Sequence, residues 1–151
     1  MIKKSFELKS ENIKENYFFL FYGQNEGLKN EIIEKIFKKN YSENIYNYEE
    51  NEILKNQEDF FNNILSGSFF ESEKLIIINR VTDKLKDIIE ELIEKEISGL
   101  VIILNTKTLE KKSKIRSLFE KNKKTVCVPF YEDNNQTLSG IISSFFREKK
   151  I

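Results

Sequence analysis

The sequence contains no histidine and no tryptophan, and it has only one cysteine and one proline among its 151 residues. Without histidine, the Ser–His–Asp and Cys–His nucleophile systems and histidine-ligated zinc or iron are excluded. The single cysteine, Cys127, can form neither an internal disulfide nor a cysteine metal cluster. No apolar run approaches the roughly 20 residues that cross a bilayer. We therefore expect a cytoplasmic domain that has no metal or cofactor and does not contact a membrane.

The charges balance, with 25 basic and 25 acidic side chains. A formal charge of zero argues against a general nucleic-acid binder. The length suits one domain, and the hydrophobic content of 39% is enough for one core. The only proline, Pro129, ends an apolar run, and no linker rich in Pro, Gly or Ser divides the chain. We therefore expect residues 1–151 to form a single domain.

Short apolar runs alternate with longer amphipathic ones along the chain. The runs predict strands near residues 17–22, 44–48, 74–79, 100–104 and 125–128. The amphipathic segments predict helices near residues 28–37, 60–65, 85–93, 115–119 and 138–146. Strands that are apolar throughout favour a parallel sheet covered by helices on both faces, a doubly wound α/β fold. In such folds, binding sites gather at the carboxyl ends of the strands.

The turn after the first strand has the context of a phosphate-binding loop, G-x-x-x-x-G-K-[ST]. Gly23 ends the strand, and Lys29 lies six residues later, where the loop lysine would be. Gly27, however, comes one position early, Leu28 is bulky where the backbone should approach phosphate, and Asn30 lacks the metal-binding hydroxyl. We therefore favour the alternative for both glycines, a tight turn with no ligand.

The next strands lack the remaining chemistry of an ATPase. The strand at residues 74–79 ends in Asn79, where an acidic metal ligand would be needed. Asn105 occupies the place of a polar sensor, although it can also cap the following loop. We expect no tight ATP binding and no ATP hydrolysis. An active P-loop ATPase or nucleotide kinase is the first alternative, and a flavodoxin- or receiver-like regulatory module is the second. Asn79 disfavours a receiver, and the absence of Ser and Thr from residues 23–30 disfavours a flavodoxin.

Three segments together resemble the delta subunit of bacterial DNA polymerase III. Residues 19–29 are similar to the opening strand and turn of that family, residues 68–78 to a second signature, and residues 100–130 to its later strands. The resemblance implies an AAA+ fold with a degenerate nucleotide site and a five-stranded parallel sheet in the order 5-1-4-3-2. It also implies a non-catalytic part in a clamp loader, whose parent complex is a DNA-directed DNA polymerase. The partner would be the sliding clamp, or beta subunit, whose ring the subunit helps to open.

The chain departs from that family in length. The family continues through a helical lid and a collar, whereas this sequence ends at Ile151, where the lid would begin. We therefore expect a single AAA+-like N-terminal domain over residues 1–151. Contacts with the ATPase and delta-prime types of clamp-loader subunit, and indirectly with DNA, would need the absent C-terminal region.

The aromatic pair Phe69 and Phe70 is the main candidate for partner binding. Phe60, Phe61, Ile64 and Leu65 already supply the core face of the preceding helix, and the polar residues 71–73 follow the pair. An apolar anchor inside a polar rim is typical of an interface hot spot. By resemblance, the pair, preceded by the small residue Ser68, is the wedge that enters the sliding clamp. The alternative is that one or both rings cap the core.

A basic segment is the second candidate surface. Residues 107–124 contain eight basic side chains against two acidic ones. The spacing of Lys107, Lys111 and Lys114 predicts one face of a helix, which could contact DNA phosphates. The alternative is a solvated helix face with no ligand.

Overall fold

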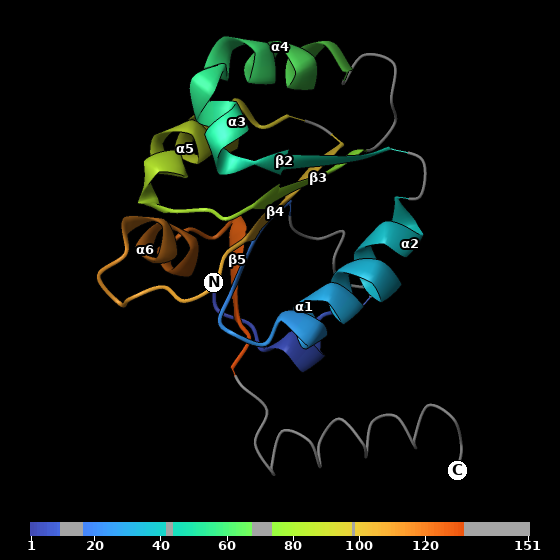
Figure 1. Cartoon of the computed structure of the whole chain (residues 1–151), viewed down its shortest axis with the longest axis vertical. Helices are drawn as coiled ribbons and strands as arrows, with labels where there is room; N and C mark the ends of the chain where they lie inside the picture. The colour runs from blue at the N-terminus through green and yellow to red at the C-terminus, as the bar shows by residue number, and fades with distance from the viewer. Residues whose placement is uncertain (10–16, 42–43, 68–73, 98, 132–151) are drawn as a thin grey trace.

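The computed structural model describes residues 1–9, 17–41, 44–67, 74–97 and 99–131 (Figure 1). Its centre is one sheet of five strands in the order β2-β3-β4-β1-β5, and every pairing is parallel. The strands are β1 (Phe18–Tyr22), β2 (Ile45–Glu49), β3 (Lys74–Asn79), β4 (Leu100–Asn105) and β5 (Thr125–Pro129). This is the expected order 5-1-4-3-2 read from the other edge, so the fold class and strand order are confirmed.

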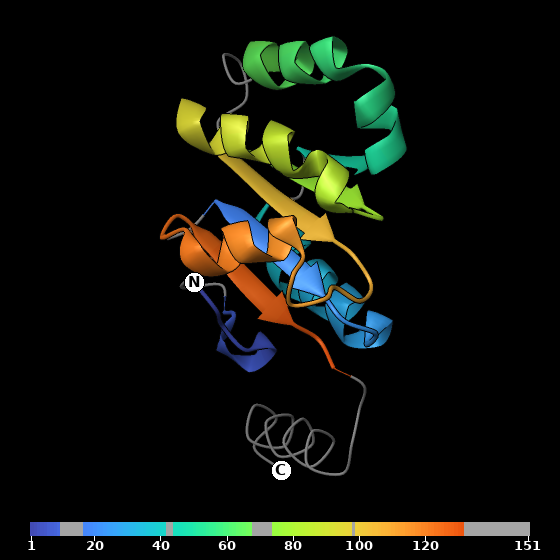
Figure 2. The same ribbon diagram turned by 90° about the vertical axis from the view of Figure 1, so that its left-hand side faces the viewer.

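Helices cover both faces of the sheet and make three layers (Figures 1 and 2). On one face lies a continuous helical segment formed by α1 (Glu26–Ile32), a π-helical stretch (Ile33–Phe37) and α2 (Lys38–Asn40). The other face carries α3 (Glu50–Lys55), α4 (Gln57–Gly67), α5 (Lys86–Lys95) and α6 (Lys114–Lys121). Short 3-10 turns occur at Ser5–Glu7 and Asp83–Leu85.

The two cores differ in the side chains that fill them. All five residues of β1 are buried, because this strand lies between β4 and β5 and both of its faces are covered. The odd-numbered face of β1 packs Phe19 and Phe21 against Phe37 and Phe130, with ring centroids 5.0 to 6.3 Å apart. The even-numbered face meets the aliphatic side chains of α4, α5 and α6. The first core is therefore built around a cluster of aromatic rings, whereas the second is largely aliphatic.

The two edges of the sheet are not equivalent. On the outer side of β5, Ile2 bridges to Cys127; the N–H of Cys127 donates to the carbonyl of Met1 at 2.7 Å, and the N–H of Lys3 donates to the carbonyl of Cys127 at 3.0 Å. Pro129 is the last residue of β5, consistent with an edge strand, where a missing N–H is tolerated. The other edge is β2, which the described residues leave open.

Two elements differ from the sequence-based expectation. Helix α3 lies in the acidic stretch after β2, where no helix was expected. Helix α6 begins only at Lys114, so residues 107–113 form a loop. The expected closing helix at residues 138–146 lies outside the described residues. Among the described helices, none has the length and apolarity to cross a membrane.

Candidate functional site

The turn between β1 and α1 is closed by backbone contacts from two other loops. Gly23 has a φ of +114°, and a Cβ atom there would overlap the backbone carbonyl oxygen of Phe130. The N–H of Gly23 donates to the carbonyl of Lys107. The N–H of Asn25 donates to the carbonyl of Phe130 at 3.2 Å. N–H groups that would face phosphate in a phosphate-binding loop are thus engaged within the chain.

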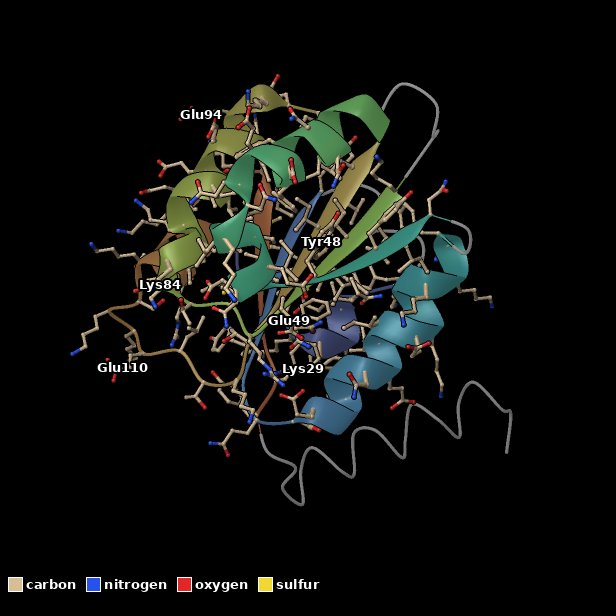
Figure 3. The ribbon with its side chains drawn as sticks, turned by 45° about the horizontal axis from the view of Figure 1, so that its top comes forward. Lys29, Tyr48, Glu49, Lys84, Glu94 and Glu110 are labelled. Carbon is tan, nitrogen blue, oxygen red and sulfur yellow. The ribbon has the colours of Figure 1, made fainter. Side chains whose placement is uncertain are left out.

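Lys29 is turned into the protein. It is 0% exposed, and Figure 3 places it between α1 and the ends of the strands. Its ammonium donates to the carbonyl of Thr106 at 2.5 Å and to Glu26 Oε1 at 3.0 Å. Two of the three ammonium donors are therefore used inside the fold. The position is that of a phosphate-binding lysine, but here the side chain ties the loop after β4 to α1.

The ends of the neighbouring strands β3 and β4 meet through two amides. Asn79 and Asn105 lie opposite each other in the ladder, and Asn105 Nδ2 donates to Asn79 Oδ1 at 3.2 Å. The structure therefore brings these two side chains together, a contact that was not predicted from the sequence. The side-chain amides of the two residues are hydrogen-bonded to each other. Neither position carries a carboxylate that could hold a metal ion.

Two carboxylates near these strand ends were not assigned a role from the sequence. Glu50 is 5% exposed and accepts hydrogen bonds from the N–H and the hydroxyl of Thr82, both at 2.8 Å. Asp83 Oδ1 accepts from Ser113 Oγ at 2.7 Å and from the N–H of Ile115 at 3.1 Å. Burial raises the pKa of Asp83, but these hydrogen bonds outweigh it, so the pKa is lowered. Both groups hold loops and helix ends in place, and no cluster of three metal-binding side chains occurs among the described residues.

The expected basic face is not formed in the way the spacing predicted. Only Lys114 lies in a helix, while Lys107 and Lys111 belong to the loop before it. The helix starts where it does because Ser113 is its N-cap, with Oγ accepting from the N–H of Arg116 at 3.3 Å. The grouping of these three lysines on one helical face is therefore wrong. Their contact with DNA stays a prediction.

The structure instead shows a basic groove between α5 and α6, with a volume of about 420 Å³. Its charged lining consists of Lys86, Lys112, Lys114, Lys121 and Glu90, a balance of four positive charges to one negative. We call these four lysines and their surroundings the basic groove. Lys86 pairs with Glu90 at 3.3 Å and Lys112 with Glu110 at 3.4 Å. Neither Lys114 nor Lys121 forms a salt bridge among the described residues, although the charge of Lys114 is near enough to Asp83 to help lower the pKa of that carboxyl.

Not every basic side chain of this segment is available for a ligand. Arg116 Nε lies 2.6 Å from Glu120 Oε1, and its Nη1 donates to the carbonyl of Leu109 at 3.0 Å. The guanidinium also lies over the ring of Tyr22, 4.8 Å from the centroid. The hydrogen bond to Glu120 raises the pKa of Arg116 further. This arginine therefore fixes α6 on the sheet.

The candidate partner-binding residues Ser68, Phe69 and Phe70 lie outside the described residues. Their neighbours are described: α4 ends at Gly67 and β3 begins at Lys74. Within α4, Phe60 and Ile64 are each 2% exposed, so their assignment to the core is confirmed. The ring of Phe60 packs edge-on against Tyr48, with centroids 5.2 Å apart. The core face of α4 is thus filled by residues that precede the aromatic pair.

Comparison with known proteins gives a family match and a structural match. The family model "DNA polymerase III, delta subunit" matches residues 19–130. A solved structure, the Bacillus subtilis DNA clamp loader delta protein (YqeN), superposes with a TM-score of 0.66 at 13% sequence identity. The match covers 96% of this chain and 47% of that protein, so the chain spans about half the length of the solved structure. No curated protein matches the sequence. The family match extends from β1 to the end of β5 and includes the closed turn, the paired asparagines and the basic groove, and the chain therefore belongs to the DNA polymerase III delta subunit family.

Proposed function

We propose that this chain is a non-catalytic clamp-loader domain that binds the sliding clamp and helps to open its ring during DNA replication. The observation that carries the proposal is the family match over residues 19–130. Phe69 and Phe70, with Ser68 before them, are the proposed contact. They follow a helix whose core face is already filled by Phe60 and Ile64.

The apolar area of the two rings is large enough to give measurable affinity for the clamp. Two phenyl rings bury on the order of 300–400 Å² together. At about 25 cal/mol per Å², this area gives roughly 8–10 kcal/mol before the costs of association are subtracted. Micromolar or tighter affinity is therefore within reach of this pair alone.

The experiment is a titration of the chain against the sliding clamp of the same organism. Biolayer interferometry should give saturable binding of one chain to the clamp. Clamp preloaded on circular DNA should then be released faster when the chain is added, because opening the ring is the only way off a closed circle. Failure to bind the clamp at 100-micromolar chain, on the order of the weakest useful affinity, would refute the proposal.

The same proposal holds that the chain has no ATPase activity. It is supported by the engaged ammonium of Lys29, by Glu26 beside it at 3.0 Å, and by the amide pair of Asn79 and Asn105. An incoming γ-phosphate would have to displace an internal hydrogen bond and approach a carboxylate. Calorimetry with Mg-ATP should detect no binding, and micromolar affinity would contradict this part of the proposal.

The basic groove favours a second candidate function, a direct contact with DNA phosphates. Lys114 and Lys121 are two turns apart on α6, or about 10.5 Å along the axis. Two ammonium groups at this separation can contact different phosphates of one DNA backbone. The groove replaces the set Lys107, Lys111 and Lys114 as the surface to test.

Charge reversal tests that contact. Lys114→Glu combined with Lys121→Glu should weaken binding to a labelled duplex at low salt and reduce the slope of log affinity against log salt by about 2. Lys35→Glu, at an exposed lysine on the opposite face of the sheet, is the matched control and should change the slope by less than about 1. Equal slopes for the two variants would rule out the groove as the contact.

A further inference from the structure

Strand β2 is an open edge of the sheet in the part of the chain that the structure describes. The opposite edge, β5, is covered by residues 1–3. In the middle of β2, Tyr46 and Asn47 point to opposite faces, and both are exposed. At this point the described residues leave the outer side of β2 open and cover its two faces only in part.

The outward hydrogen-bonding groups of β2 follow from its register. The N–H of Leu75 donates to the carbonyl of Asn44 at 2.8 Å, and β2 pairs in parallel with β3 from Ile45↔Leu75 to Glu49↔Asn79. In a parallel ladder, alternate residues bond to the neighbouring strand. Tyr46 and Tyr48 thus bond to β3, while the N–H and C=O groups of Ile45 and Asn47 face outward.

Within the described residues, this edge lacks the usual protection against strand pairing. Proteins block edges with lysine, proline, bulges or a covering segment. Strand β2 has the sequence Ile-Tyr-Asn-Tyr-Glu, which contains no lysine and no proline and is rich in strand-forming side chains. The charged side chain of β2 is Glu49 at its carboxyl end, which lies 3.7 Å from Arg80. The residues before it place neither a steric nor a charge barrier in the way of an added strand.

A cavity of about 260 Å³ opens beside this edge, on the face covered by α4. Its floor is formed by Tyr48, Ile64 and Ile76, and Tyr46, Asn63 and Lys74 complete the lining. Tyr48 is held edge-on against Phe60, so the floor is fixed. Lys74 is 5% exposed, and its ammonium lies 5.7 Å from the ring centroid of Tyr46. The lining has a lysine and an asparagine and no acidic residue.

We propose that β2 is a docking edge for an extended acidic peptide of another protein, which adds a strand to the sheet and places a carboxylate in this cavity. The backbone of the peptide would pair with Ile45 and Asn47. Alternate side chains of an added strand fall on the same face as Tyr46 and Tyr48, and one of them reaches the cavity.

The positive charge of Lys74 in the cavity favours an acidic side chain on the bound peptide. A carboxylate there faces the buried ammonium of Lys74, where attraction is stronger than in water. The Lys74 side chain lines the cavity and makes other contacts within the chain, and its ammonium attracts a carboxylate placed beside it. The amide of Asn63 offers a further donor.

A second copy of this chain fits the cavity less well. The residues of β2 on the cavity face are Tyr46 and Tyr48, so pairing two copies through β2 brings aromatic rings to the cavity and no carboxylate. Pairing of two five-residue strands also buries less than the roughly 1,200 Å² of a stable interface. A peptide ligand needs no such area.

The test is a selection from a random nine-residue peptide library, displayed on phage, against the immobilised chain. Enriched peptides should alternate β-branched or aromatic residues with a fixed Asp or Glu. In fluorescence polarisation, replacing that acid by its amide should weaken binding at least tenfold to the wild-type chain and at most twofold to Lys74→Met. Asn47→Pro, which removes an outward N–H, should weaken binding at least tenfold, whereas Asn47→Thr should stay within twofold.

Hydrogen exchange gives a readout that does not depend on a variant. Exchange at the amides of Ile45 and Asn47 should slow when the peptide binds. The proposal is overturned if no peptide is enriched, if enriched peptides lack an acid, if Asn47→Pro folds and binds as well as wild type, or if exchange at these two amides is unchanged. A dimer that forms with increasing concentration and is abolished by Asn47→Pro would assign the edge to a second copy instead.

Discussion

Lys29→Met should remove the hydrogen bonds that connect α1 to the loop after β4, while keeping a side chain of similar length. The wild-type ammonium is fully buried and donates to the carbonyl of Thr106 at 2.5 Å and to Glu26 at 3.0 Å. Methionine fills the same space but donates no hydrogen bond. The carbonyl of Thr106, in a residue that is 8% exposed, then loses its charged donor.

The magnitude follows from these two contacts. A hydrogen bond to a charged group contributes about 1.5–3 kcal/mol net, and a buried acceptor left without a donor costs about 1–3 kcal/mol. The pair with Glu26 adds little, because the Glu26 side chain is 48% exposed and water screens the interaction. Methionine also avoids the cost of burying a charge, which offsets part of the loss. We expect a net destabilisation of about 2 kcal/mol.

Urea unfolding followed by far-ultraviolet circular dichroism measures this effect, since the chain has no tryptophan for fluorescence. With a slope near 2 kcal/mol per M, the midpoint should fall by about 1 M. Lys35→Met is the control, because the Lys35 side chain is 73% exposed and its pair with Glu31 lies at the surface; its midpoint should move by less than about 0.25 M. Equal midpoints for Lys29→Met and wild type would refute the assigned role of Lys29.

Three further predictions concern the same fold. Gly23→Ala should destabilise the chain by more than about 1 kcal/mol, because φ is +114° and the new Cβ meets the carbonyl of Phe130. Gly27→Ala in α1 should instead stabilise the chain by about 0.5 kcal/mol. Thermal melts of the two variants should therefore show shifts of opposite sign. The pKa of Asp83 is lowered in the folded chain, so its contribution is present at neutral pH and is lost as pH falls through the folded-state pKa. Asp83→Asn should therefore be less stable than wild type at pH 7, and the difference should shrink in acid; a constant difference would contradict this. Burial raises the pKa of Cys127 to about 12, so a thiol reagent at pH 8 should label Cys127 only as fast as the chain unfolds, and rapid labelling of the native chain would contradict its burial.

The sequence predicted the strands well because of their position in the sheet. β1, β3 and β4 lie between two neighbours and have both faces covered, so nearly every side chain in them is apolar and buried. Alternation of strands and helices then indicates a parallel sheet. The strand order came only from the resemblance, because local periodicity carries no information about which strands are neighbours.

Contacts between distant segments account for the features that the sequence did not predict. The stretch Glu50–Lys55 has few apolar residues, but Glu50 is fixed by Thr82 from another loop and the segment forms α3. Lys29 is buried because its acceptor, the carbonyl of Thr106, lies far along the chain. Neither contact can be predicted from the residues next to it in the sequence.

The basic groove shows one signal that could have been used. Ser113 directly precedes the apolar periodicity of α6 and is a typical N-cap residue, which would have excluded Lys107 and Lys111 from that helix. The contribution of Lys86 could not have been found this way, because it comes from α5, and only the packing of α5 beside α6 brings it to the groove.

The central claim is that Phe69 and Phe70 bind the sliding clamp, and the affinity of a double variant tests it most directly. Phe69→Ala with Phe70→Ala should lower clamp affinity by about 100-fold or more, at roughly 2 kcal/mol or more for each hot-spot residue, with an unchanged unfolding midpoint. Phe6→Ala, at a phenylalanine that is 70% exposed, is the matched control and should bind as the wild type does. A folded double variant with wild-type clamp affinity would contradict the claim, and so would a loss of a few kcal/mol of folding stability without a separate loss of affinity.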